Sequence, residues 1–304
     1  MWCLDLENGQ VCLGISGNSG NIGSGLLGSV APVPASYYSY QVSDRVYLGF
    51  SLNSPYGLET ESGAWVGGPH GFKSRITNIV ATPVMGLKLS ENVSIAMGVQ
   101  FSYIDGRLTT AFPGTRATLT EVEGDDFSAG LVGGVTFDLS EYTTFGVGLR
   151  GPIEHELDGS FSTAAIPFTT NMTADVTLPA QITASVSHRF NEKIKVNASA
   201  EWTNWSTLQT LNIQTVALGN IVQTFDWRDG WFFALGGEYA VNEAVMLRAG
   251  AAYEITPVRD ANRGTRVPDN DRVWLSVGGS YVWNDWMTLH GSYTHIFVED
   301  GNVN

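Results

Sequence analysis

The sequence predicts an all-β protein, a transmembrane antiparallel up-and-down β-barrel in which about twelve strands are present. Three observations indicate this fold class. Apolar and polar residues alternate with a period of two, short polar turns alternate with long connections, and charged residues stand in mid-strand on one face only. A strand with one apolar and one polar face is typical of a barrel wall between lipid and a polar lumen.

The composition excludes several other classes. The chain has 304 residues, 30 of them acidic and 16 basic, and its net charge of −14 has the wrong sign for a protein that binds nucleic acid phosphates. Charged residues make up 15% and aromatic residues 11%, the reverse of a disordered composition. Residues 8–43 carry no charge, but glycines and prolines interrupt them too often for a membrane-spanning helix.

Residues 93–103 show the alternation most clearly. The odd positions hold Val, Ile, Met, Phe and Tyr, and the even positions hold Ser, Ala, Gly and Gln. The pattern recurs at residues 46–53, 182–187, 194–202, 245–254 and 272–281. Each of these segments is expected to be a strand with its apolar side toward lipid.

The connections alternate in length. Short polar turns are expected at residues 43–45, 90–92, 140–141, 191–193, 242–243 and 284–285, and long irregular connections at 55–73, 111–124, 155–175, 206–226 and 255–270. Outer-membrane barrels have short periplasmic turns and longer extracellular loops. The chain is therefore divided into an irregular Gly/Ser-rich segment (1–32), a barrel (33–298) and a loop-like tail (299–304). A large soluble β-protein with an aromatic core is the alternative.

Several short motifs make the pattern more specific. The longest are Thr256-Pro257-Val258-Arg259-Asp260-Ala261-Asn262-Arg263 and Val267-Pro268-Asp269-Asn270-Asp271-Arg272-Val273-Trp274-Leu275-Ser276; others are Ser54-Pro55-Tyr56-Gly57-Leu58, Leu178-Pro179-Ala180, Trp202-Thr203-Asn204-Trp205 and Trp227-Arg228-Asp229. In this order they closely resemble the long-chain fatty acid transporter family of Gram-negative outer membranes, which also includes aromatic-hydrocarbon uptake channels.

The resemblance implies a fourteen-stranded barrel with an N-terminal hatch domain that carries an Asn-Pro-Ala motif. It also implies that a hydrophobic ligand is captured at the extracellular loops and moves inward by diffusion. The sequence has no Asn-Pro-Ala motif, and by count it lacks one strand at each end. We therefore expect a chain without the hatch and the terminal strands. Direct pairing of residues 33–42 with 286–298, which would close a twelve-stranded barrel, is the alternative.

Basic residues are candidates for binding a ligand carboxylate. Arg228 lies in the Trp-Arg-Asp motif, where the resemblance implies a basic residue near the ligand, and Arg107 is a second expected lumenal cation. At the family's other basic position this chain has Thr110. An ion pair of Arg228 with Asp226 or Asp229, which would hold the wall together, is the alternative.

Apolar loop residues would bind the rest of the ligand. The candidates are Trp65, Phe72, Phe112, Phe168 and Pro257, and packing of loop against loop is the alternative. Seven charged residues are expected to form a structural network in the lumen, because an unpaired charge there is costly: Lys195, Glu201, Arg248, Glu254, Asp269, Asp271 and Arg272.

Catalysis and metal binding have little support in the sequence. The five histidines form neither an HExxH motif nor a spaced ligand set, so we expect no catalytic residue, no metal and no cofactor. His290 beside Ser292 keeps a barrel enzyme open as a minor alternative. Cys3 and Cys12 either close one small disulfide loop or stay unpaired.

The function expected from these observations is passive uptake of hydrophobic molecules, first of all long-chain fatty acids, across the cell outer membrane. The partners would be the hydrophobic ligand, outer-membrane lipid and lipopolysaccharide, and the barrel would be a monomer. Two other functions stay open: a general-diffusion or structural barrel, and an aromatic-hydrocarbon channel.

Overall fold

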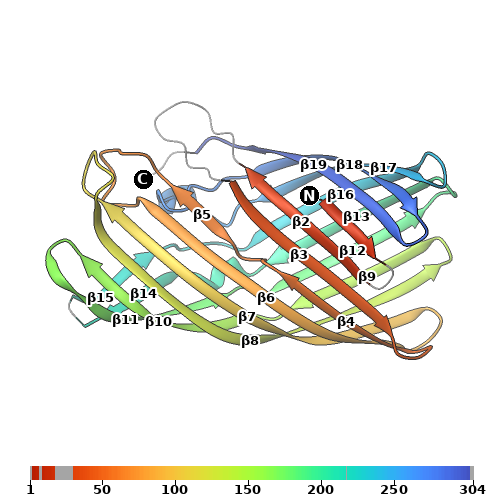
Figure 1. Ribbon diagram of the computed structural model, residues 1–304, viewed down its shortest axis with the longest axis horizontal. Coiled ribbons are helices and arrows are strands. Elements are labelled where there is room, and N and C mark those ends of the chain that lie inside the picture. Colours follow the sequence, from red (N-terminus) through yellow and green to blue (C-terminus); the bar gives the residue numbers. More distant parts are fainter. Residues whose placement is uncertain (1, 7–8, 18–29, 217, 302–304) are drawn as a thin grey trace.

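The computed structural model describes residues 2–6, 9–17, 30–216 and 218–301. Its wall is a ring of long tilted strands (Figure 1). In order around the ring these are β1 (Trp2–Leu6), β2 (Gly9–Gly17), β3 (Val30–Gln41), β4 (Val46–Asn53), β6 (Lys73–Lys88), β7 (Val93–Ala111), β8 (Thr118–Ser140), β9 (Thr143–Arg150), β12 (Gln181–Arg189), β13 (Ile194–Thr203), β16 (Gly230–Ala240), β17 (Val245–Ile255), β18 (Arg272–Asn284) and β19 (Met287–Val298).

Every strand of this ring pairs antiparallel with the next, and β19 pairs back with β1. The described residues thus form a closed barrel of fourteen strands, twelve of which lie within residues 30–298. The predicted fold class and the twelve strands of that part are confirmed. The expectation that two strands are missing is wrong, because β1 and β2 complete the fourteen.

The N-terminal segment corrects the expectation of irregular structure. Residues 2–17 form the β1–β2 hairpin, whose register sets Cys3 opposite Cys12, and this hairpin separates β3 from β19. The direct twelve-stranded closure is therefore wrong, because residues 33–42 pair with β2 and not with β19. Residues 18–29 lie outside the described residues, and residues 299–301 follow β19 without regular structure.

The physical reason is the cost of an open edge. Hydrocarbon cannot form hydrogen bonds with free backbone N–H and C=O groups, and each group without a partner costs several kcal/mol. Pairing with both edges therefore outweighs the weak local pattern of a glycine-rich segment.

The remaining strands lie at one end of the barrel, which we call the long-loop end (Figure 1). They are β5 (Leu58–Glu61), β10 (Ile153–Thr163), β11 (Ile166–Leu178), β14 (Thr210–Thr215) and β15 (Gly219–Thr224), accompanied by two short 3-10 helices, η1 (Trp205–Thr207) and η2 (Asp260–Asn262). β10 pairs with β8 and β11, and β11 pairs with β14. The long connections expected to be irregular therefore hold additional sheet.

The opposite end has the expected short turns. Their geometry is fixed by side chains that accept backbone N–H bonds. Asn191 Oδ1 accepts from Lys193 and Ile194, and Asn242 Oδ1 accepts from Ala244 and Val245, all at 2.9 Å. Such turns need two or three residues and leave the strands in register.

The outer face of the wall is apolar over a band of membrane thickness. On β8, Phe127, Leu131 and Leu139 are 65–68% exposed. The twelve steps from Phe127 to Leu139 span about 40 Å at ~3.3 Å per residue, and a tilt near 45° reduces this to about 28 Å, close to the ~25 Å band of outer-membrane barrels. Beyond Phe127 the outward positions become Asp125 and Glu123. Among the described residues no helix is long and apolar enough to cross a bilayer.

The two faces of β18 should respond differently to one added charge. Val277 is 60% exposed on the outer band, whereas its neighbour Ser276 lines a lumenal cavity. Val277→Arg should destabilise the barrel folded in vesicles by about 2–4 kcal/mol, because the charge enters hydrocarbon. Ser276→Arg should cost clearly less. Urea titrations of folding into lipid vesicles measure both, and equal losses would contradict this assignment of faces.

Candidate functional site

The polarity of the sheet inverts at the long-loop end. On β10, the side chains of Ile153, His155 and Leu157 are buried, while the acidic residues between them are exposed. In the membrane band the apolar side faces outward, but here it faces the interior of the barrel. The long-loop end therefore has an apolar interior and an acidic exterior.

One extra residue causes the inversion. Arg150 is opposite Val132, and Asp158 is opposite Asp125. The β9–β10 strand thus advances eight residues while β8 advances seven, and a slip of one residue turns every following side chain to the other face. The slip falls at Gly151-Pro152, where proline has no N–H for the ladder.

Nine buried residues form what we call the inner apolar cluster. They are Tyr56, Ile104, Ile153, Leu157, Phe161, Met172, Ala174, Leu178 and Ile213. They come from β7, β10, β11, β14 and the loop after β4, so the cluster joins opposite parts of the barrel interior. Close approach of the strands contributes: a Cβ on Gly159 would lie 1.9 Å from the carbonyl oxygen of Glu123.

Tyr56 ties this cluster to the aromatic residues of the loops. Its hydroxyl donates to the Pro179 carbonyl oxygen at 2.9 Å, and its ring meets Trp205 edge-on with centroids 6.0 Å apart. Trp205 in turn contacts Trp227 at 5.3 Å. Burial raises the pKa of the Tyr56 hydroxyl to about 12, so the group stays protonated and keeps donating.

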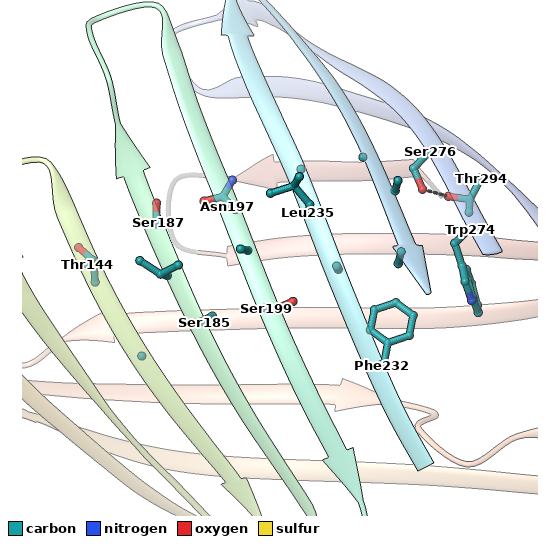
Figure 2. Close-up of a pocket in the computed structure, with 18 of the residues that line it drawn as sticks. Thr144, Ser185, Ser187, Asn197, Ser199, Phe232, Leu235, Trp274, Ser276 and Thr294 are labelled. Atoms are coloured by element: carbon teal, nitrogen blue, oxygen red, sulfur yellow. Dashed lines mark hydrogen bonds between the residues drawn. The ribbon is translucent and has the colours of Figure 1, made fainter. Parts of the chain in front are cut away.

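Toward the short-turn end, the lumen holds a cavity of about 600 Å³. Figure 2 shows side chains from β9, β12, β13, β16, β18 and β19 around it. Most of them are small or carry hydroxyl groups, as Ser185, Ser199 and Ser276 do, and Phe232 and Trp274 add an apolar surface with ring centroids 5.8 Å apart. A second cavity of about 520 Å³ shares some of the same lining residues. Small side chains thus leave room in the lumen between the inner apolar cluster and the short-turn end.

A buried polar array lies beside the cluster. Asp126 Oδ2 is 2.7 Å from His155 Nδ1, His155 Nε2 is 3.1 Å from Ser102 Oγ, and Asn78 Nδ2 donates to Ser102 Oγ at 2.8 Å. The order of groups matches that of serine hydrolases, but Ser102 and His155 are 0% and 1% exposed. With no surface open to a substrate, the array acts as a structural link between β6, β7, β8 and β10.

Arg228, the first sequence-based candidate, lies outside the inner apolar cluster. Its side chain is exposed, and its Nε donates to the Thr256 carbonyl oxygen at 3.1 Å. It lines a polar cavity of about 610 Å³ together with Arg263 and four acidic residues, Asp260, Asp271, Glu299 and Asp300. The four carboxylates outnumber the two guanidinium groups, so the surroundings do not favour the head-group role, which stays a prediction.

Arg107 corrects a sequence-based placement. It stands on the same face of β7 as the lipid-facing Met97 and Tyr103, and it forms an ion pair with Glu121 at 2.7 Å. Arg107 therefore lies on the outer face above the membrane band and not in the lumen. The odd-numbered, outward-facing positions of residues 93–103 continue to Arg107 on the part of β7 that extends beyond the band.

The apolar loop candidates are brought together only in part. Trp65, Phe72 and Phe112 lie on adjoining loops, since Gly114 N–H donates to the Trp65 carbonyl oxygen at 2.8 Å and Phe72 N–H to that of Thr109 at 3.0 Å. Pro257 is buried, and its carbonyl oxygen accepts from the Arg228 N–H. Phe168 is 61% exposed, apart from the cluster. Tyr56 and Phe161, which are not among the five selected candidates, belong to the cluster.

The predicted lumen network divides into separate groups. Lys195 and Arg248 both contact Glu238, at 3.5 and 3.6 Å, and Arg272 contacts Asp269 as well as Glu254. Glu201 instead accepts from Thr183 Oγ1 at 2.9 Å. Asp271 accepts from the Thr256 N–H at 2.8 Å. Glu238, which joins the first group, was missed because its partners come from neighbouring strands.

Two further interior arginines, Arg150 and Arg266, carry no signal in the sequence. The loop before β18 brings Arg266 across the barrel to β6 and β7, where its Nη1 donates to Ser74 Oγ and the Thr109 carbonyl oxygen. Local patterns cannot show such a crossing. His290 Nδ1 lies 2.6 Å from Ser280 Oγ. Among the described residues no three His, Cys, Asp or Glu side chains are arranged to hold a metal ion.

Known proteins share this architecture. The crystal structure of a Pseudomonas aeruginosa FadL homologue matches with a TM-score of 0.85 at 22% identity, covering 98% of this chain and 82% of that one. The Pseudomonas putida toluene transporter TodX matches with a TM-score of 0.65 at 17% identity, covering 97% and 87%. At these identities the likeness shows the fold.

Sequence comparison gives the family. A long-chain fatty acid transport protein of Escherichia coli O6:H1 is 23% identical, covering 96% of this chain and 74% of the relative, and a 47 kDa outer membrane protein of Pasteurella multocida is 24% identical, covering 90% and 74%. The model of the outer membrane protein transport family (OMPP1/FadL/TodX) matches residues 10–304. This chain is therefore an outer-membrane β-barrel that belongs to the OMPP1/FadL/TodX transport protein family.

Proposed function

We propose that the protein is a passive uptake channel for hydrophobic molecules, with long-chain fatty acids as the first candidate. The observation that carries the proposal is the inner apolar cluster at the long-loop end of the barrel. In outer-membrane barrels the long loops are the extracellular ones, so we place this end outside the cell. An apolar molecule can exchange contacts with such a cluster without entering water. The small-residue cavities below it offer space for onward movement.

A general-diffusion pore is supported less well. The lumen of such a pore should be filled with water and lined by polar side chains from end to end. Here buried apolar side chains from four strands and one loop meet in the lumen, and they would present a barrier to hydrated sugars. The alternative of an aromatic-hydrocarbon channel is favoured by one observation, the likeness to the toluene transporter.

The roles of Trp65, Phe72, Phe112 and Pro257 remain part of the proposal as a capture surface next to the cluster. Trp65, Phe72 and Phe112 lie on adjoining loops, and Pro257 lies buried beside Arg228; in the proposal a ligand meets the three aromatic residues first. The proposed partners are the hydrophobic ligand and the outer-membrane lipid, including lipopolysaccharide, and the proposed state is a monomer.

The two uptake modes can be separated with the purified barrel. We expect saturable binding of oleate in detergent, measured by isothermal calorimetry, and little swelling of barrel-containing liposomes in arabinose. Rapid swelling without oleate binding would replace the proposal with a general pore. Tight binding of toluene without oleate binding would favour the aromatic-hydrocarbon channel.

A charge in the cluster should block the ligand without preventing folding. Leu157 lies on β10, beyond the membrane band, so Leu157→Asp should weaken oleate binding at least tenfold (about 1.4 kcal/mol or more) while the barrel keeps its heat-modifiable migration on gels. Val216, which is 83% exposed in the β14–β15 turn, offers the control Val216→Asp, for which no change is expected. Unchanged oleate binding in Leu157→Asp would remove the cluster from the path.

A further inference from the structure

The loop between β17 and β18 crosses the mouth of the barrel. Residues 256–271, which we call the strap, leave β17 and return to β18, yet Arg266 in this loop contacts β6 and β7. In the described ring, β8, β9, β12, β13 and β16 separate β7 from β17, and β4, β3, β2, β1 and β19 separate β6 from β18. With equal numbers of strands on the two sides, the strap joins opposite points of the ring and divides its opening.

The strap base, on the side of β17 and β18, is held by carboxylates. Asp271 Oδ1 accepts from the Thr256 N–H at 2.8 Å, and Asp269 Oδ2 accepts from the Thr256 hydroxyl at 2.6 Å. Arg263, which is 3% exposed, donates to the Asp269 carbonyl oxygen at 2.9 Å, and Arg272 forms an ion pair with Asp269. Hydrogen bonds to ionised groups are the stronger ones, so the base is the firmly attached end of the strap.

The strap tip, residues 264–268, is held across the mouth by neutral groups. Arg266 Nη1 donates to Ser74 Oγ at 3.3 Å and to the Thr109 carbonyl oxygen at 3.2 Å. The Thr60 hydroxyl donates to the Arg266 carbonyl oxygen at 3.0 Å. The two glutamates of β5 form ion pairs with Lys73, and burial lowers the pKa of Arg266 without a carboxylate that opposes the effect. These three bonds, which we call the latch, are long and can be exchanged for bonds to water.

Gly71 lets the strap tip approach the loop before β6. A Cβ at this position would lie 2.7 Å from Thr265 Oγ1 and 3.1 Å from Arg266 Cγ, so a larger residue would push the tip away. The Gly71 carbonyl oxygen accepts from the indole N–H of Trp65 at 3.4 Å, and Phe72 is the next residue along the chain. The tip therefore rests beside two of the aromatic residues that form the proposed capture surface.

We propose that the strap is a gate whose base stays fixed while its tip leaves Gly71 and admits a hydrophobic molecule to the inner apolar cluster. The inference rests on the proposed uptake function and adds the step that controls entry. A loop that spans the opening obstructs a molecule as large as oleate. Of its two attachments, the latch has no ion pair and releases first, so the strap swings about its base, as lid loops do about their hinges.

A disulfide between the strap tip and its contact would lock the gate. A Cβ at position 71 would lie 3.7 Å from Thr265 Cβ, close to the mean separation of about 3.8 Å in disulfides. In a Cys3→Ser, Cys12→Ser background, Gly71→Cys combined with Thr265→Cys should slow oleate association at least tenfold after oxidation. Reduction should restore the rate to within twofold. Stopped-flow fluorescence of the detergent-solubilised barrel measures the rate, and Gly71→Cys alone and Thr265→Cys alone are the matched controls, which should respond to neither reagent.

Weakening the latch should have the opposite effect. Arg266→Met keeps most of the side-chain volume but removes both bonds from Nη1. Oleate association should become at least threefold faster, while the dissociation constant stays within twofold of the wild type because the inner apolar cluster is unchanged. Arg116→Gln, which removes an exposed loop arginine, is the control and should leave the rate unchanged. Heat-modifiable migration on gels establishes that each variant has a folded barrel.

The outcomes separate the gate from the proposed function. Equal association rates in the locked and the reduced barrel would overturn the gate and leave hydrophobic uptake standing, and so would failure of the disulfide to form. Weaker oleate binding at an unchanged rate in Arg266→Met would overturn the latch. If the reduced barrel binds no oleate, the proposed function fails. Arabinose swelling of liposomes then tests the gate, and equal swelling with locked and reduced barrels would reject it.

Discussion

The demand of the backbone for hydrogen-bond partners in hydrocarbon governs the rest of this structure. A sheet that crosses a bilayer cannot keep a free edge, because lipid offers nothing to the exposed N–H and C=O groups. The β1–β2 hairpin meets that demand by pairing β2 with β3 and β1 with β19. Closure fixes which face of every strand looks outward, and from that assignment follow the apolar band, the lumen and the positions of the interior charges.

The inversion of polarity beyond the membrane band gives the barrel an apolar interior at its long-loop end. In the band, apolar side chains belong outside and small or polar ones inside. One extra residue at Gly151-Pro152 reverses this for β10, so that apolar side chains turn inward and acidic ones outward. The same sheet thereby builds a lipid-facing surface at one level and an apolar interior at the next, and a hydrophobic molecule has a dry region to occupy at the outer end.

The interior charged residues fall into two groups, those that form ion pairs and those that bond neutral oxygens. Lys195, Arg248 and Glu238 neutralise one another beside the periplasmic part of the wall, which favours a structural role there. Arg150 and Arg266 instead donate to neutral oxygens, those of Gln100, Ser74 and the Thr109 backbone.

The sequence by itself determined the fold class, the twelve strands between residues 30 and 298, the short turns and the family, because period-two alternation and turn residues are local signals. It also led to the expectation that the charged residues of β13 and β17 lie on the lumenal face, where Lys195 and Arg248 contact Glu238. Only the tertiary structure decided what depends on neighbours distant in the chain: the hairpin that closes the ring, the extra residue that turns β10, and the crossing of the barrel by Arg266. Each of these results from pairing between strands or loops, and the energies that select a register or an edge do not appear in the residues of one segment alone.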